Sequence, residues 1–239
     1  MPDISSPGKI AAVRGYGAEV VFSGSTAPER LAAVEKVVRE EGKTLVPPYD
    51  HENIIVGQGT CVLEVLREWP EVEVVVVPCG GGGLLAGSCL AAVGSGTLVF
   101  GAEPRAGGTD DCGRGLKEGV RVETVDEGWR TCADGLRTPV GVRNWGVIKE
   151  HCAGVVSVSE EGIKEAMRLV LERCKVVVEP SACVGLAALL EGGMLREELE
   201  RRFPGRGDED PVRVAVVLSG GNATVEKIAE VFGIGNSAA

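Results

Sequence analysis

The residues best suited to chemistry form a glycine run at the end of an apolar segment. Gly80, Gly81, Gly82 and Gly83 follow Cys79, and a segment with helical character begins at Leu84. Residues without side chains let backbone N–H groups turn inward around an anion, and a helix N-terminus adds partial positive charge. The run therefore predicts a phosphate site, although the same glycines would also suit a close-packed turn.

These residues alone do not identify the compound that carries the phosphate. Residues 81–86 also satisfy the G-x-G-x-x-A pattern of a dinucleotide site, and Glu103 lies near the spacing expected of a ribose-binding acid. A second glycine turn contains Ser219 and follows the last apolar segment. The Ser219 hydroxyl suits a neutral ring nitrogen of a ligand, or it caps the next helix.

The segments around these turns alternate between strands and helices. We expect strands at residues 18–22, 72–77, 97–102, 155–158 and 212–218, each followed by a helical segment. Repeated strand–helix–strand units predict an α/β fold with a doubly wound, mainly parallel sheet. The run of valines at 74–77 is apolar on both faces, which is typical of a middle strand.

A Pro-Pro pair at residues 47 and 48 predicts a crossover between two lobes. We expect residues 1–47 to be the remnant of a small α/β lobe and residues 48–239 to form a large lobe that binds a cofactor. Residues 118–138, where periodicity fades, are expected to form a functional loop, and residues 192–211 a solvated connection.

Composition excludes several classes of function. The chain of 239 residues has a net charge of −10 and no cluster of Lys or Arg, so nucleic acid is not an expected partner. No apolar stretch approaches the ~18 residues of a membrane span, and we expect a soluble, cytoplasmic protein. Eight cysteines without a CxxC, beside two histidines, predict mostly buried, reduced thiols rather than a zinc site.

Taken together, the motifs resemble those of the serine racemase and serine/threonine dehydratase family, which are fold-type II pyridoxal-phosphate (PLP) enzymes. They occur in the family's order with similar gaps, and the resemblance spans about residues 3–232. It implies a tryptophan synthase β-like fold, a homodimer, and small hydroxy amino acids such as L-serine and L-threonine as substrates. The motifs are Gly57-Gln58-Gly59-Thr60, Val77-Pro78-Cys79-Gly80-Gly81-Gly82-Gly83-Leu84, Ala102-Glu103-Pro104, Ala133-Asp134-Gly135-Leu136, Val178-Glu179-Pro180-Ser181-Ala182 and Leu218-Ser219-Gly220-Gly221-Asn222.

The resemblance also implies roles for individual residues. Gly80, Gly81, Gly82 and Gly83 would hold the PLP phosphate, Gly135 would lie beside the cofactor ring, and Ser219 would face the pyridine nitrogen. A Mg²⁺ or Ca²⁺ site would use the carboxylates of Glu103 and Asp111 and the backbone carbonyl near Thr109, which are oxygen ligands of the kind these ions prefer. The alternative for Asp110 and Asp111 is an N-cap pair at the next helix.

Two strings that the family carries upstream of these motifs do not occur in this sequence. One holds the lysine that forms the Schiff base with PLP, in a Ser-Phe-Lys-type context, and the other is a Ser-Ser-Gly-Asn-His-type loop with the opposite-face serine. We therefore expect Met1 to be an internal methionine of a truncated chain. Such a chain would have no catalytic residue of its own, would bind PLP without a covalent bond, and would not run racemisation or β-elimination.

The sequence leaves two alternatives to the function of a PLP-dependent racemase or ammonia-lyase. The first is a non-catalytic PLP-lobe fragment or a partner of a full-length subunit. The second, a dinucleotide-binding protein, rests on the glycine pattern at residues 81–86.

Overall fold

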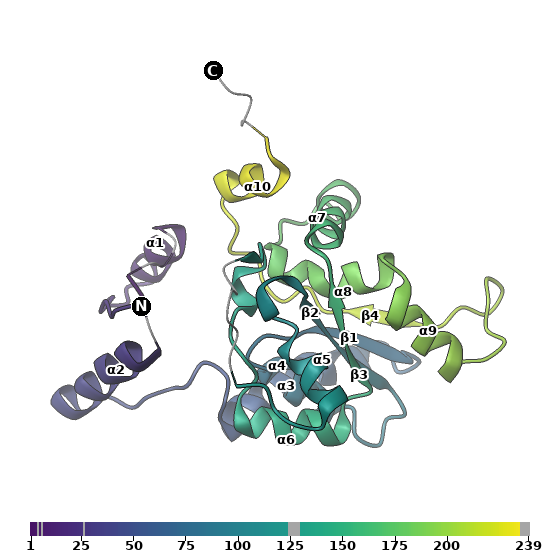
Figure 1. The fold of residues 1–239 in the computed structure, drawn as a ribbon, viewed down its shortest axis with the longest axis horizontal. Helices are drawn as coiled ribbons and strands as arrows, with labels where there is room; N and C mark the ends of the chain where they lie inside the picture. The colour runs from purple at the N-terminus through teal and green to yellow at the C-terminus, as the bar shows by residue number, and fades with distance from the viewer. Residues whose placement is uncertain (4, 6, 26, 124–129, 235–239) are drawn as a thin grey trace.

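A four-stranded parallel sheet forms the centre of the molecule. The computed structural model describes residues 1–3, 5, 7–25, 27–123 and 130–234. The strands are β1 (Val74–Pro78), β2 (Leu98–Pro104), β3 (Gly154–Val158) and β4 (Val214–Val216), in the order β3-β2-β1-β4 (Figure 1). Every neighbouring pair is parallel. The predicted α/β fold with a parallel sheet is confirmed.

Helices cover both faces of this sheet, as a doubly wound fold requires. Val75 and Val77 of β1 belong to one buried core and Val74 and Val76 to the other, so the strand is apolar on both faces, as its sequence predicts. The first core includes residues of α3 (Glu52–Glu68), α4 (Gly83–Ala91), α5 (Asp111–Glu118) and α6 (Val142–His151). The second includes residues of α7 (Glu160–Leu169), α8 (Pro180–Leu190), α9 (Gly193–Arg202) and α10 (Val225–Phe232).

Two glycines allow α3 and α4 to approach at backbone distance. A Cβ atom at Gly87 would lie 2.2 Å from the carbonyl oxygen of Ile55, and one at Gly59 would lie 2.7 Å from the carbonyl oxygen of Gly87. Any side chain here would push the helices apart. Since α4 begins at the glycine run, this close packing fixes where the run lies.

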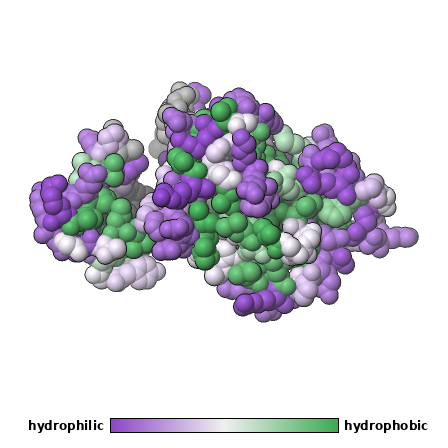
Figure 2. Space-filling view, turned by 90° about the horizontal axis from the view of Figure 1, so that it is seen from below, coloured by the Kyte–Doolittle hydropathy of each residue, from purple (hydrophilic) through white to green (hydrophobic). Residues whose placement is uncertain are grey.

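The N-terminal part is a pair of helices set off from the sheet, α1 (Pro7–Gly15) and α2 (Ala27–Glu41) (Figures 1 and 2). None of its described residues up to position 47 is fully buried. The strand predicted at residues 18–22 is wrong. The nearest pairing is one isolated bridge between Pro2 and Ser23, just after the segment, and a strand needs a continuous partner to satisfy its backbone groups.

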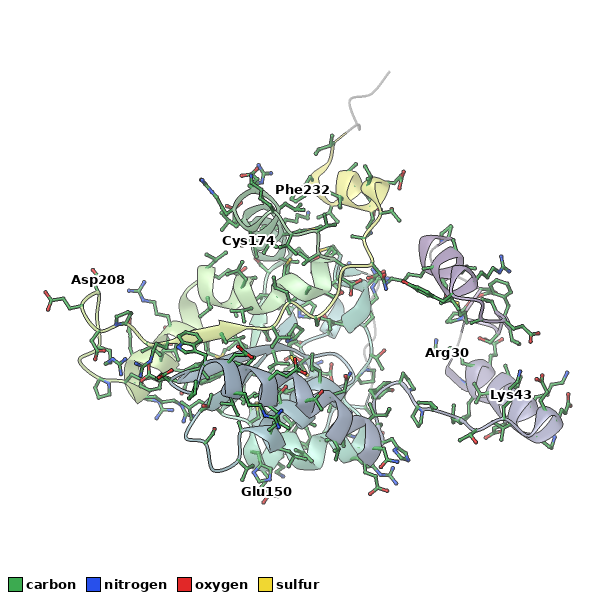
Figure 3. All side chains as sticks on the ribbon, turned by 180° about the vertical axis from the view of Figure 1, so that it is seen from behind. Arg30, Lys43, Glu150, Cys174, Asp208 and Phe232 are labelled. Carbon is green, nitrogen blue, oxygen red and sulfur yellow. The ribbon has the colours of Figure 1, made fainter. Side chains whose placement is uncertain are left out.

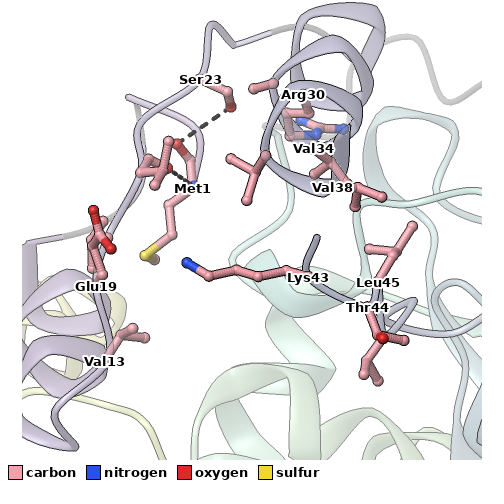
Figure 4. A pocket seen from close by; sticks show the side chains of 15 residues that line it. Met1, Val13, Glu19, Ser23, Arg30, Val34, Val38, Lys43, Thr44 and Leu45 are labelled. Carbon is pink, nitrogen blue, oxygen red and sulfur yellow. Dashed lines mark hydrogen bonds between the residues drawn. The ribbon is translucent and has the colours of Figure 1, made fainter. Parts of the chain in front are cut away.

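An open apolar groove of about 400 Å³ lies within this N-terminal part (Figure 4). Val34 and Val38 of α2 face Val13 and Met1 across it, and the Lys43 side chain extends into it. Lys43 also forms an ion pair with Glu41.

Two loop predictions compare differently with the structure. The solvated connection predicted at residues 192–211 is wrong in its first half, which forms α9, because Leu195 anchors this helix in the core. The loop beyond α9 projects from the body, with Asp208 near its tip (Figure 3). Residues 118–138 lie partly outside the described residues. Within the described residues, no helix is both long and apolar enough to span a bilayer.

Candidate cofactor and cation sites

All the residues predicted to bind PLP line one cavity, at the carboxyl end of the sheet. This cavity, of about 800 Å³, is bounded by Gly80, Gly81, Gly82, Gly83, Gly135 and Ser219. Its other wall comes from the segment between α1 and α3, including Arg30, Pro48 and Tyr49. Figure 2 shows the separation between the N-terminal part and the larger body. The volume falls within the ~300–1,000 Å³ that small-molecule sites occupy.

The glycine run forms a tight turn from β1 into α4. Gly82 is the N-cap of α4 and has φ 86°, a left-handed conformation that residues with a Cβ rarely adopt. A Cβ at Gly80 would lie 2.9 Å from the Cα of Leu136. Among the described residues, no backbone acceptor pairs with the backbone N–H groups of the run. These donors at a helix N-terminus fit a phosphate.

Two side chains that the sequence does not suggest hold the glycine run in place. Asn144 is buried in α6 and donates from Nδ2 to the carbonyl oxygen of Gly81 at 2.6 Å. Asp50 accepts from the backbone N–H groups of Val142 at 3.0 Å and Arg143 at 2.9 Å, and so caps α6. Asp50 directly follows the crossover segment that lines the cavity. Its hydrogen bonds therefore connect this segment to α6, the helix whose Asn144 contacts the glycine run.

Gly135 and Ser219 reach the cavity from separate segments. The N–H of Gly135 donates to the hydroxyl of Ser181 at 3.0 Å, at the start of α8. Ser219 follows β4 and is exposed. Near both lies Glu179, whose pKa burial raises, and a Cβ at Gly220 would lie 2.7 Å from its carboxylate. The carboxyl group therefore packs closely against Gly220 and borders the place predicted for a cofactor ring.

No described lysine lines this cavity. Lys9 of α1 pairs instead with Asp134 at 3.0 Å, beside a neighbouring cavity.

The predicted cation ligands are buried at the carboxyl end of β2. Glu103 is 1% exposed, and its two carboxylate oxygens accept from the N–H groups of Gly113 at 2.7 Å and Cys112 at 3.2 Å. Burial raises the pKa of Glu103 well above its ordinary value. Backbone amides are the donors it contacts, so its negative charge lacks a cationic partner among the described side chains.

Asp111 and Thr109 lie close to Glu103 in the chain but hold other contacts. Asp111 accepts from the N–H of Val140 at 3.0 Å, and burial raises its pKa from 3.8 to about 6. The Thr109 hydroxyl donates to the carbonyl of Pro104 at 3.0 Å. Asp110 occupies the N-cap of α5 without a side-chain cap bond. The charge of Arg114 acts on Asp111, whereas Glu103 forms no ion pair among the described residues. A buried carboxyl such as Glu103 fits a cation, and the N-cap pair is not formed.

The matched family decides between the compounds that the glycine run suits. A model described as "Pyridoxal-phosphate dependent enzyme" matches residues 1–220. The chain belongs to this family of PLP-dependent enzymes. Membership in this family favours PLP as the cofactor, so the dinucleotide alternative loses its support.

Relatives of this PLP-dependent chain include racemases and ammonia-lyases. It is 35% identical over 234 residues to a serine racemase of Dictyostelium discoideum, covering 97% of this chain and 68% of the racemase. It is 36% identical over 234 residues to an L-threo-3-hydroxyaspartate ammonia-lyase of Saccharomyces cerevisiae, covering 96% and 66%. The chain thus spans about two thirds of the length of these relatives.

Solved structures place the fold among the same enzymes. The crystal structure of the Dictyostelium discoideum serine racemase matches with a TM-score of 0.80 and 34% identity, covering 94% of this chain and 68% of that one. The crystal structure of a threonine deaminase from T.th. matches with a TM-score of 0.78 and 40% identity, covering 92% and 68%. The predicted fold-type II architecture is therefore confirmed.

Proposed function

We propose that this chain provides the PLP-binding lobe of a racemase or ammonia-lyase that acts on small hydroxy amino acids. The observation that carries the proposal is the convergence of Gly80 to Gly83, Gly135 and Ser219 on one cavity in a member of the PLP family. Serine, threonine and 3-hydroxyaspartate are the substrate class that the relatives' names support.

In this proposal each part of the cavity has a separate task. The glycine run and the N-terminus of α4 would bind the phosphate, Gly135 would lie beside the ring, and the Ser219 hydroxyl would pair with the pyridine nitrogen. When bound, PLP supplies an electron sink for removal of the substrate's α-proton. Asn144 and Asp50 keep the site in shape by fixing the turn and the crossover.

We propose further that the chain binds PLP without a covalent bond and is inactive alone, because no described lysine lines the cavity. Titration with PLP should show saturable binding, and borohydride reduction followed by peptide mapping should leave no lysine modified stoichiometrically. Gly80→Ala should abolish binding, because its Cβ would lie 2.9 Å from the Leu136 backbone. Gly146→Ala is the matched control, since open space surrounds that position on α6.

Two results would count against this proposal in different ways. Equal PLP affinity in Gly80→Ala and Gly146→Ala would remove the glycine run from the site. A single stoichiometrically labelled lysine with turnover of L-serine would show a catalytic chain, while leaving the substrate class intact.

We propose that Glu103 and Asp111, with the backbone carbonyl near Thr109, bind Mg²⁺ or Ca²⁺ in this chain. The support is the burial of both carboxyls, of which Glu103 forms no ion pair among the described residues. An ion that binds only the folded form at ~100 times its Kd would add about 2.7 kcal/mol of stability. Asp111→Asn should lose most of that gain in thermal melts, and an equal gain in both proteins would exclude Asp111.

The division into lobes at residues 1–47 and 48–239 and the homodimer also remain proposals. Limited proteolysis with mass analysis would test the first, since cleavage should concentrate at the exposed crossover around residue 46. Analytical ultracentrifugation would test the second.

A further inference from the structure

Three buried side chains with metal-binding atoms meet beside the glycine run. Cys79 follows β1 directly, Glu103 lies on β2, and Cys112 lies in the first turn of α5. The two sulfur atoms and a carboxylate oxygen all lie within 4.8 Å of one another. Each residue is 1% exposed. Neighbouring elements of the fold thus aim a thiol, a thiol and a carboxyl at the same point.

The two thiols and the carboxyl group have no cationic side chain paired with them among the described residues. The Cys79 thiol donates to the backbone carbonyl oxygen of Gly80 at 3.7 Å. Backbone N–H groups are the donors that Glu103 contacts, and no described Lys, Arg or His side chain forms an ion pair with it. A buried cluster of this kind gains by exchanging protons for a cation.

We infer that Cys79, Glu103 and Cys112 form a binding site for a thiophilic divalent cation such as Zn²⁺. Thiolate sulfur selects zinc over Mg²⁺ and Ca²⁺, which prefer oxygen ligands. Three protein ligands are the number that zinc sites with one solvent ligand use. On binding, two thiols and one carboxylic acid each release a proton, so the ion becomes bonded to two thiolates and one carboxylate.

The cluster lies next to the large cavity. Pro78 and Gly80, the chain neighbours of Cys79, line the large cavity. The N–H groups of Gly113 and Cys112 already orient the carboxylate of Glu103 from the N-terminal turn of α5. These outer contacts position a ligand before the ion arrives, as in protein metal sites generally.

Glu103 also belongs to the Mg²⁺ or Ca²⁺ site proposed above, so the two ions compete for one carboxylate. A thiophilic ion would therefore displace Mg²⁺ or Ca²⁺. It would also fix the position of Cys79, the residue that precedes the glycine run. Detection of the thiolate site needs neither PLP nor turnover. Its failure would leave the proposed PLP function untouched.

The experiment uses Cd²⁺ and Zn²⁺ as probes on the whole chain kept reduced. Cadmium–thiolate bonds absorb in the ultraviolet, so titration reports how many thiolates bind and how tightly; Zn²⁺ is then added in competition. The variants are Cys79→Ala and Cys112→Ala, and the matched control is Cys183→Ala, a buried thiol in the other core. We expect each site variant to bind Cd²⁺ at least ~10-fold more weakly than wild type, because loss of an outer-shell partner alone costs ~10–100-fold.

Equal Cd²⁺ affinity in wild type and both site variants would overturn the inference, as would an equal loss in Cys183→Ala. A second measurement needs no variant. X-ray absorption of the zinc-loaded wild-type chain should give a shell with two sulfur atoms at ~2.3 Å. A shell of nitrogen and oxygen atoms alone would contradict the inference, because Cys79 and Cys112 would then serve only as buried apolar side chains.

Discussion

Removing the charge of Asp111 is expected to change how the stability of the metal-free protein depends on pH. Burial raises the pKa of this carboxyl from 3.8 to about 6. Because the pKa is higher in the folded chain, the bound proton stabilises the fold below pH 3.8, and that contribution is lost as the pH rises through 6. Each pKa unit corresponds to about 1.36 kcal/mol, so keeping Asp111 charged costs about 3 kcal/mol above this window.

Asp111→Asn isolates this contribution, because the amide oxygen can still accept from Val140 but cannot titrate. We expect wild type to lose about 3 kcal/mol more than the variant between about pH 4 and pH 7. Some pH dependence should persist in the variant, because the pKa of Glu103 is raised in the same direction.

Urea unfolding followed by circular dichroism, in excess chelator at several pH values, measures this difference. Glu118→Gln is the control, since it removes an exposed carboxyl from the same helix. A parallel loss of stability in Asp111→Asn and wild type over the window would refute the assigned role of Asp111, and so would a Glu118→Gln profile that matches that of Asp111→Asn.

Three smaller tests concern the sheet, the helix pair and the glycine run. Gly87→Ala should lower the free energy of unfolding by about 3 kcal/mol or more in urea titrations, because its Cβ would lie 2.2 Å from the Ile55 carbonyl oxygen. Glu73→Gln should destabilise at pH 7 and progressively less toward acid, because its ion pairs lower the pKa of Glu73 and their contribution is lost as the pH falls. Gly82→Ala should cost about 1–2 kcal/mol in thermal melts through its φ of 86° alone.

The sheet and the glycine run could be predicted because their signals are local. The valines at 74–77 are apolar at every position, and only a strand covered on both faces buries them all, which the two cores confirm. The glycine run is recognised from consecutive residues that lie within a single turn between a strand and a helix. Short-range rules are sufficient for both features.

Asn144 and Asp50 could not be found in the same way, because their roles arise from contacts across the chain. Asn144 meets Gly81 from 63 positions away, and Asp50 meets Val142 from 92 positions away. The strand expected at residues 18–22 failed for a related reason. Apolar composition favours a strand, but only a partner strand satisfies its backbone, and composition does not supply one.

The candidate cation ligands also include some residues that were expected from the sequence and others that only the fold brings together. The family resemblance implies Glu103 and Asp111 as oxygen ligands. The spacing of the cysteines, which lacks a CxxC, predicts apolar side chains. In the fold, Cys79 and Cys112 come within 4.8 Å of the Glu103 carboxylate from different elements. A carboxylate that is 1% exposed must either keep its proton or bind a cation. Since hard and soft ions would use the same Glu103 oxygens with different neighbours, the ion that occupies the site depends on the Asp111 carboxylate and the two thiols rather than on Glu103 itself.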